Sequence, residues 1–171
     1  MSLQPCPVPP VPTKTVRVAR AAFAKGNVVS RMRDELGAIS DDEAFASLFP
    51  VRGQPAIAPW RLALVTIFPF VEDLSDRQAV EAVRGRIDGT YALSLELTDP
   101  GFDASVLCEF RRRLVEGDAG HVLLDPLVTR LRDRGLRKGR GRQRTDSTHI
   151  LGAVRALTRF ELVAETLPKR K

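Results

Sequence analysis

The chain has 171 residues, of which 43% are hydrophobic, 28% charged and 6% aromatic, and its formal net charge is +6. This is the size of one domain, or of one domain with part of a second, and the apolar content excludes a wholly disordered or fibrous chain. The longest uncharged apolar run, residues 62–71, has ten residues, whereas a membrane-spanning helix needs about twenty, so we expect no membrane partner.

The N-terminal segment is rich in proline, since residues 1–13 hold five of the twelve prolines. This composition predicts an extended, mobile arm that contributes nothing to a core. No basic region followed by an apolar run opens the chain, so we expect a cytoplasmic protein. Helical patterns follow at residues 15–24 and 28–36, and Gly37 suits the left-handed cap that ends the second.

Two segments, SDDE at residues 40–43 and SDRQ at residues 75–78, have the spacing of a capping box. In this motif the serine hydroxyl and the acidic or amide side chain each accept a hydrogen bond from an otherwise unpaired backbone N–H. The first box predicts a short helix that ends near Phe49, and the second predicts a helix that ends at Gly85.

The central core helix is predicted to begin at Pro59, because a first helical turn tolerates a residue without an N–H. Its apolar side chains repeat at helical spacing: Trp60, Leu64, Ile67, Phe68 and Val71. We expect Pro69 to bend or shorten this helix. Apolar side chains alternate over residues 91–97, which fits a short strand as well as a helical turn.

The clearest amphipathic helix covers residues 104–116 and has Asp103 as its N-cap. Its apolar face carries Leu107, Phe110 and Leu114. At about 100° per residue, Arg112 points away from that face, and Arg111 and Arg113 flank it.

A further helix is predicted to start at residues 125–126 and to end near Gly135. Positive charge gathers from there on: residues 130–171 hold 13 basic and 4 acidic side chains, whereas residues 1–129 hold 14 and 17. Eight of these basic side chains form a basic window over residues 130–144: Arg130, Arg132, Arg134, Arg137, Lys138, Arg140, Arg142 and Arg144. Such a cluster is typical of nucleic-acid binding, and a solvated, charged connector explains it equally well.

Few groups suit metal or nucleophile chemistry. Cys6 and Cys108 have no ligand spacing and predict two free thiols. Asp146, just after the basic window, can hold Mg²⁺ through its carboxylate, although an Asp in this setting is more often a turn or an N-cap. Glu161 and Glu165 are spaced as companions of such a site, or as a solvated helix flank.

A helix-turn-helix over residues 75–95, or in the region that ends at residues 110–114, fits a small helical domain. In the first, Arg77 and Arg84 help to read bases if their helix enters a groove. Recognition helices read bases near their N-termini, whereas residues 111–113 lie late in theirs. Phosphate contacts therefore suit these three arginines better.

Several segments together resemble bacterial insertion-sequence transposases of the DDE type with an InsH-like N-terminal domain. They are FASLFP (45–50), RGQP (52–55), APWR (58–61), LSDRQA (74–79), LTDPGF (97–102), FRRRL (110–114) and GRQRTDSTH (141–149). The resemblance, over residues 3–167, implies a helical region that engages terminal inverted repeats, followed by an RNase H-like domain in which three carboxylates hold two Mg²⁺ ions. Asp146, by its position in TDST, corresponds to the first of these acids, a catalytic metal ligand.

We therefore predict a mainly α fold in four parts: a proline-rich arm (1–13), a helical DNA-binding domain (14–135), a basic hinge (136–144) and the truncated start of an RNase H-like domain (145–171). The predicted DNA contacts are Arg77, Arg84, Arg111, Arg112, Arg113, Arg134, Arg137, Lys138, Arg140, Arg142 and Arg144.

Only the first of the three acids is present, so we expect a catalytically incomplete transposase fragment with no cofactor of its own. It would bind double-stranded transposon ends at the bacterial nucleoid and associate with itself or with a full-length transposase. Two alternatives stay open. One is a functionless remnant of an inactivated element, and the other is one half of a split enzyme whose remaining acids come from a second polypeptide.

Overall fold

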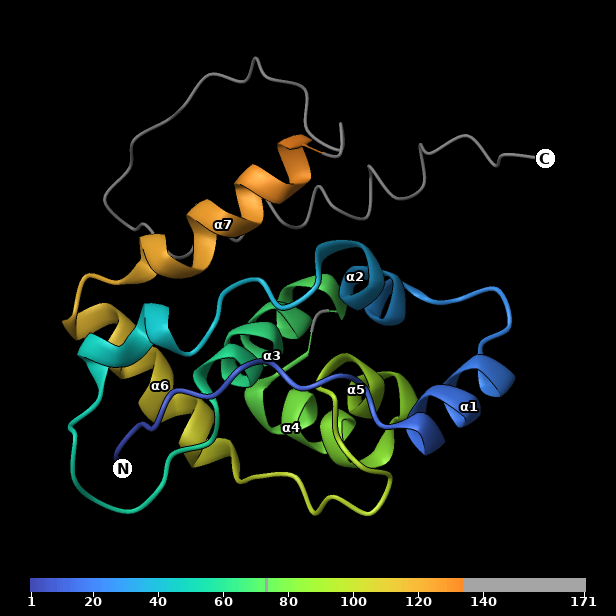
Figure 1. Ribbon diagram of the computed structural model, residues 1–171, viewed down its shortest axis with the longest axis horizontal. Coiled ribbons are helices and arrows are strands. Elements are labelled where there is room, and N and C mark those ends of the chain that lie inside the picture. The colour runs from blue at the N-terminus through green and yellow to red at the C-terminus, as the bar shows by residue number, and fades with distance from the viewer. Residues whose placement is uncertain (73, 134–171) are drawn as a thin grey trace.

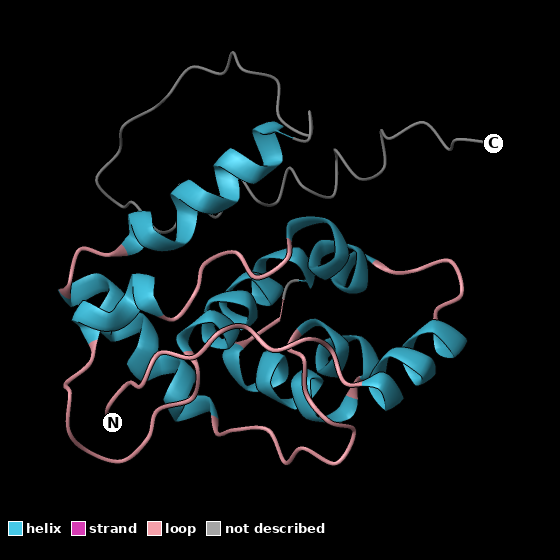
Figure 2. Ribbon diagram, in the orientation of Figure 1, coloured by secondary structure: helices cyan, strands magenta, loops and turns pink. Residues whose placement is uncertain are grey.

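The computed structural model describes residues 1–72 and 74–133, and this part of the chain is built of helices joined by loops (Figure 1). The helices are α1 (Thr13–Ala22), α2 (Val28–Leu36), the 3-10 helix η1 (Glu43–Leu48), α3 (Pro59–Glu72), α4 (Asp76–Gly85), α5 (Ile87–Ala92), α6 (Ala104–Glu116) and α7 (Gly120–Asp133). Figure 2 shows no strand among them. The mainly α prediction is thus confirmed for the described residues, and the predicted RNase H-like part lies outside them. None of these helices is long and apolar enough to cross a membrane.

Helix α3 is the centre of the core. Its buried side chains include Trp60, Leu62, Ala63, Leu64, Val65, Ile67 and Phe68, and it packs against α4 and α6. It begins at Pro59, as predicted, but Pro69 does not shorten it, because the helix continues to Glu72. Burial of each large apolar side chain contributes about 1.5–3 kcal/mol, which together outweighs the roughly 3 kcal/mol cost of an interior proline.

Helices α4 and α5 follow one another with a single residue between them. Helix α4 opens with the predicted capping box, in which Ser75 accepts a hydrogen bond from the N–H of Gln78 and donates its own N–H to the Gln78 side chain at 2.8 Å. At Gly89, a Cβ would lie 3.1 Å from the carbonyl oxygen of Ala82. Glycine therefore allows α5 to pack close to α4.

The segment with alternating apolar residues is helix and turn, not strand. Tyr91 and Ala92 close α5, and the chain then turns through Ser94, whose φ is 52°. Residues 91–95 are all buried, so the alternation does not separate a buried face from an exposed one.

Helix α6 forms as predicted. Asp103 caps it by accepting a hydrogen bond from the N–H of Ser105 at 2.9 Å. Leu107, Phe110 and Leu114 are buried. Its apolar face therefore closes one side of the core against α3.

The capping box predicted at residues 40–43 is wrong. The N-cap residue of η1 is Asp42, which makes no side-chain cap, and the N–H of Ala44 donates instead to the Asp41 carboxylate at 3.1 Å. The Ser40 hydroxyl instead donates to the carbonyl of Val122 at 2.9 Å, and Asp42 accepts a hydrogen bond from the N–H of Trp60 at 3.2 Å. Both side chains are engaged by distant segments, so neither is available for a local cap.

The predicted start of the last helix is also wrong, because α7 begins at Gly120 and contains Pro126 in its interior. An interior proline has no N–H for the carbonyl four residues before it, which here belongs to Val122. The Ser40 hydroxyl bonds this same carbonyl. A tertiary contact thus permits a helix that local propensity disfavours.

The N-terminal residues lie along the helical body (Figure 1). Ser2 is buried, donates its N–H to the carbonyl of Gln54 at 2.7 Å and accepts from the N–H of Ala56 at 2.8 Å. Val8 packs against the core. The expectation of an arm without core contacts is therefore wrong, because an extended backbone can pair with another extended segment, which composition does not reveal.

Candidate nucleic-acid interface

All three arginines of α6 form ion pairs with carboxylates. Arg112 faces solvent, as predicted, and lies 2.8 Å from Glu109 and 2.7 Å from Glu116. Arg111 lies 2.6 Å from Asp76 at the start of α4. Each guanidinium thus already has a carboxylate partner, which compensates its charge.

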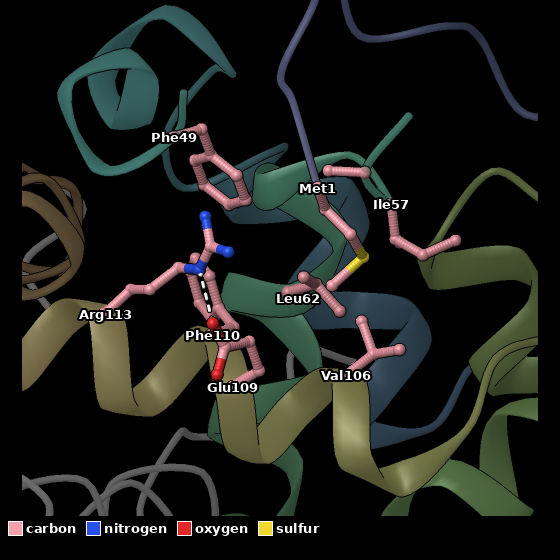
Figure 3. A pocket seen from close by; sticks show the side chains of 9 residues that line it. Met1, Phe49, Ile57, Leu62, Val106, Glu109, Phe110 and Arg113 are labelled. Carbon is pink, nitrogen blue, oxygen red and sulfur yellow. Dashed lines mark hydrogen bonds and ion pairs between the residues drawn. The ribbon is translucent and has the colours of Figure 1, made fainter. Parts of the chain in front are cut away.

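Arg113, the third, holds η1 against α6 (Figure 3). It lies 2.9 Å from Glu109, donates to the carbonyl of Leu48 at 3.1 Å and sits 4.7 Å from the centroid of the Phe49 ring. Hydrogen bonds from Arg112 and Arg113 lower the pKa of Glu109 to about 2. The carboxylate therefore stays ionised and keeps competing with any phosphate for these arginines.

Beside Arg113 lies a shallow apolar cleft between the N-terminus, the chain before α3, and α6 (Figure 3). The Met1 side chain lies in it against Leu62 and Val106. No group of three or more His, Cys, Asp or Glu side chains among the described residues could hold a metal ion. Cys6 and Cys108 are free and exposed, as predicted.

Arg77 and Arg84 lie on one exposed face of α4, because seven residues make two helical turns. Both are exposed, and neither forms an ion pair with a described residue. Hydrogen bonds from Ser105 lower the pKa of the Asp103 carboxyl, and the charges of Arg84 and Arg77 lower it further. Both arginines thus lie near the start of α6, so the structure brings these two predicted contacts together.

The helix-turn-helix predicted at residues 75–95 does not present a second helix to solvent. Helix α5 has six residues, and five of them, from Asp88 to Ala92, are buried. A buried helix cannot enter a DNA groove. Only α4 of this pair offers an exposed face.

Other arginines have structural roles. Arg33 and Arg61 each lie 5.3 Å from the centroid of the Trp60 ring, and burial lowers the pKa of both guanidinium groups. Arg130, the first member of the basic window, donates to the carbonyls of Leu36 and Ala38 at the end of α2. These cations hold helices together and are not free to meet a ligand.

Most of the predicted interface lies outside the described residues. This holds for Arg134, Arg137, Lys138, Arg140, Arg142, Arg144 and the predicted metal ligand Asp146. Within the described part of the basic window, Arg132 is exposed. The roles of the other members stay predictions from charge alone.

The structure adds a basic surface that the sequence analysis missed, on α1. Lys14, Arg17 and Arg20 are exposed and form no ion pair with a described residue. The charge count indicates this surface when the chain is divided into shorter segments. Residues 1–33 hold six basic and no acidic side chains, whereas residues 34–129 hold eight basic and 17 acidic ones. Averaging over residues 1–129 conceals this contrast.

The described residues thus form a small all-helical domain with exposed basic side chains on α1 and α4. The chain belongs to the transposase domain family (DUF772), whose model matches residues 18–113, from within α1 to α6. Neither a curated protein nor a solved structure shows significant similarity to the chain. The resemblance to transposases is confirmed at the level of the family, and its finer DDE and InsH-like features stay predictions.

Proposed function

We propose that this chain serves DNA transposition by binding double-stranded DNA at the transposon ends. Membership of a transposase domain family assigns it to transposition. The observation that carries the DNA-binding step is the exposed pair Arg77 and Arg84 on α4, because exposed guanidinium groups without an ion pair to a described residue suit base edges and phosphates alike.

The predicted contacts differ in how readily they can act. Arg77 and Arg84 have no carboxylate partner among the described residues, whereas residues 111–113 all do. A phosphate must displace those carboxylates first, so α6 contributes less to binding than α4. The basic window adds charge, and the phosphates that it would neutralise release counterions.

Catalysis in this proposal needs carboxylates and Mg²⁺ that the described residues do not assemble. Asp146, the predicted first acid, lies outside the described residues. The proposal is therefore one of binding and positioning of transposon ends.

The test is binding of the purified chain to a duplex of the terminal inverted repeats that flank its coding sequence, against a scrambled duplex of equal length. Measurement at two salt concentrations separates phosphate contacts, which salt weakens strongly, from base contacts. We expect tighter binding to the repeats at both concentrations. Equal affinity for both duplexes would contradict specific recognition of the transposon ends, and no binding to either duplex would overturn the whole proposal.

A further inference from the structure

Helix α1 is fixed to the domain by one face. Its Thr15 hydroxyl donates to the carbonyl of Leu95 at 2.8 Å in a buried hydrogen bond, and Ala19 is 4% exposed. The helix packs against α5, and it lies at one end of the molecule (Figure 1). Its opposite face is therefore open to a partner.

That opposite face is basic. With 3.6 residues per turn, Arg17 lies about 180° from the midpoint between Thr15 and Ala19, and Lys14 and Arg20 lie about 60° to either side of Arg17. The three cations thus cover the outward half of the helix, and α1 contains no acidic residue.

No described carboxylate forms an ion pair with these three cations. The first acidic residue of the chain is Asp34, and its carboxylate accepts a 2.5 Å hydrogen bond from the Tyr91 hydroxyl. The arginines of α6 differ in this respect, since each lies within 3 Å of a carboxylate. Among the described helices, α1 therefore carries the most basic side chains without an ion pair.

The spacing of the three cations suits a nucleic-acid backbone. At 1.5 Å rise per residue, Lys14 and Arg20 are about 9 Å apart along the helix axis, a length over which duplex DNA carries roughly five phosphate charges. A membrane surface fits less well, because a helix that lies on a bilayer inserts an apolar face, and the least polar side of α1 is already packed on α5.

We propose that α1 is a DNA-backbone contact surface, with Lys14, Arg17 and Arg20 each positioned to neutralise a phosphate. The inference rests on the proposed DNA-binding function and assigns part of it to a helix outside α4 and the basic window. Phosphate contacts carry no direct sequence information, so α1 adds affinity for repeat and scrambled DNA alike.

The test compares two variants of the full chain that lose the same charge, Arg17→Gln/Arg20→Gln and the control Arg31→Gln/Arg52→Gln. Arg31 is paired with Glu35 at 3.3 Å and Arg52 lies in an exposed loop. Each phosphate contact contributes about 0.9 to the slope of log K against log salt. We expect the α1 variant to flatten that slope by about 1.8 on both duplexes, the control to leave it nearly unchanged, and Arg17→Lys/Arg20→Lys to retain it.

The rate at which Lys14 is acetylated in the wild-type protein is a second measurement, and it does not depend on how a variant folds. DNA at saturation should slow acetylation of Lys14 severalfold. If the wild-type chain binds DNA but the α1 variant keeps its salt slope, or Lys14 reacts equally with and without DNA, the α1 inference is wrong and the proposed function stands. If the chain binds anionic phosphatidylserine vesicles through α1 and does not bind DNA, both are wrong.

Discussion

The Ser40 hydroxyl donates a 2.9 Å hydrogen bond to the carbonyl of Val122, the carbonyl that Pro126 leaves without its helical partner. A loop residue 82 positions earlier in the chain thus takes the place of a missing backbone N–H. A buried carbonyl without a partner costs about 1–3 kcal/mol, so this single contact helps to stabilise α7 across its proline.

The first prediction concerns this hydrogen bond between Ser40 and Val122. Ser40→Ala should lower the free energy of unfolding by about 1–3 kcal/mol, because it leaves the Val122 carbonyl unpaired. Pro126→Ala restores an N–H at the helical position, so Ser40→Ala should cost clearly less in that background. Urea unfolding of the four proteins of this double-mutant cycle measures the coupling. Additive effects of the two changes would contradict the assignment.

The second prediction concerns the contact between η1 and α6. The rings of Phe45 and Phe110 meet edge to face, with centroids 5.6 Å apart and planes at 68°, and both are almost fully buried. Phe110→Ala should destabilise the domain by about 3–5 kcal/mol. Val115→Ala, on the exposed side of the same helix, is the control and should change stability by less than about 0.5 kcal/mol. Equal effects at the two positions would place Phe110 outside the core.

The elements that the sequence predicts correctly are those governed by local rules. Helix α4 begins after its N-cap Ser75 and ends at Gly85, and α6 begins after Asp103, because a cap and an apolar stripe depend only on residues within a few positions. The errors at Ser40 and Pro126 share one cause. Their partners lie far away in the chain, so no local pattern reports them.

In the candidate site, too, local features can be predicted from the sequence and contacts between distant residues cannot. Helical periodicity places Arg112 outward on α6 correctly, and the three- and four-residue spacings of Glu109 and Glu116 from it are those of ion pairs within a helix. The ion pair between Arg111 and Asp76 joins two helices, so no local pattern indicates it. Nor does the charge count over residues 1–129 show that the cations of α1 stand apart from the acids. Charge compensation depends on which side chains the fold brings together.

The third prediction concerns acid stability at Asp88, which is buried between α2 and α5. Burial raises the pKa of this carboxyl, but hydrogen bonds from Arg86, Asn27 and the N–H of Gly89 outweigh burial and lower it below its ordinary value. A lowered carboxyl pKa contributes stability that is present above the unfolded pKa of about 3.9 and is lost as pH falls through the folded pKa.

Asp88→Asn should therefore destabilise the protein at pH 7, by about 1–3 kcal/mol for the weakened hydrogen bonds, and by less as the pH falls below about 4. Unfolding by urea at intervals between pH 7 and pH 3 checks this. A constant difference between the two proteins across that range would show that Asp88 binds its proton equally in both states.

The fourth prediction separates base reading from charge at α4. Arg77→Gln/Arg84→Gln should reduce the ratio of repeat to scrambled affinity, because a bidentate arginine–guanine contact contributes about 1–3 kcal/mol of discrimination. The matched variant Arg77→Lys/Arg84→Lys keeps the charge and loses the bidentate geometry. It should lower the same ratio while it leaves the salt slope unchanged. A ratio unaffected by either variant would mean that α4 does not read bases.

The last prediction concerns the basic window, which holds eight of the 27 Lys and Arg side chains of the chain. Residues 130–171 hold a net charge of +9 against −3 for residues 1–129, so the attraction for a polyanion is strongest there. Replacement of four of these cations by Gln, Lys138, Arg140, Arg142 and Arg144, should flatten the slope of log K against log salt by about 3–4, at about 0.9 for each lost phosphate contact.

The quadruple Gln variant should weaken binding to repeat and scrambled DNA alike, because phosphate contacts do not distinguish sequences. The control is Arg140→Lys, Arg142→Lys and Arg144→Lys together, which keeps every positive charge and should keep the parent slope. If the Gln variant also kept that slope, the basic window would be a solvated connector. DNA binding would then depend on α1 and α4, whose exposed cations the structure describes directly.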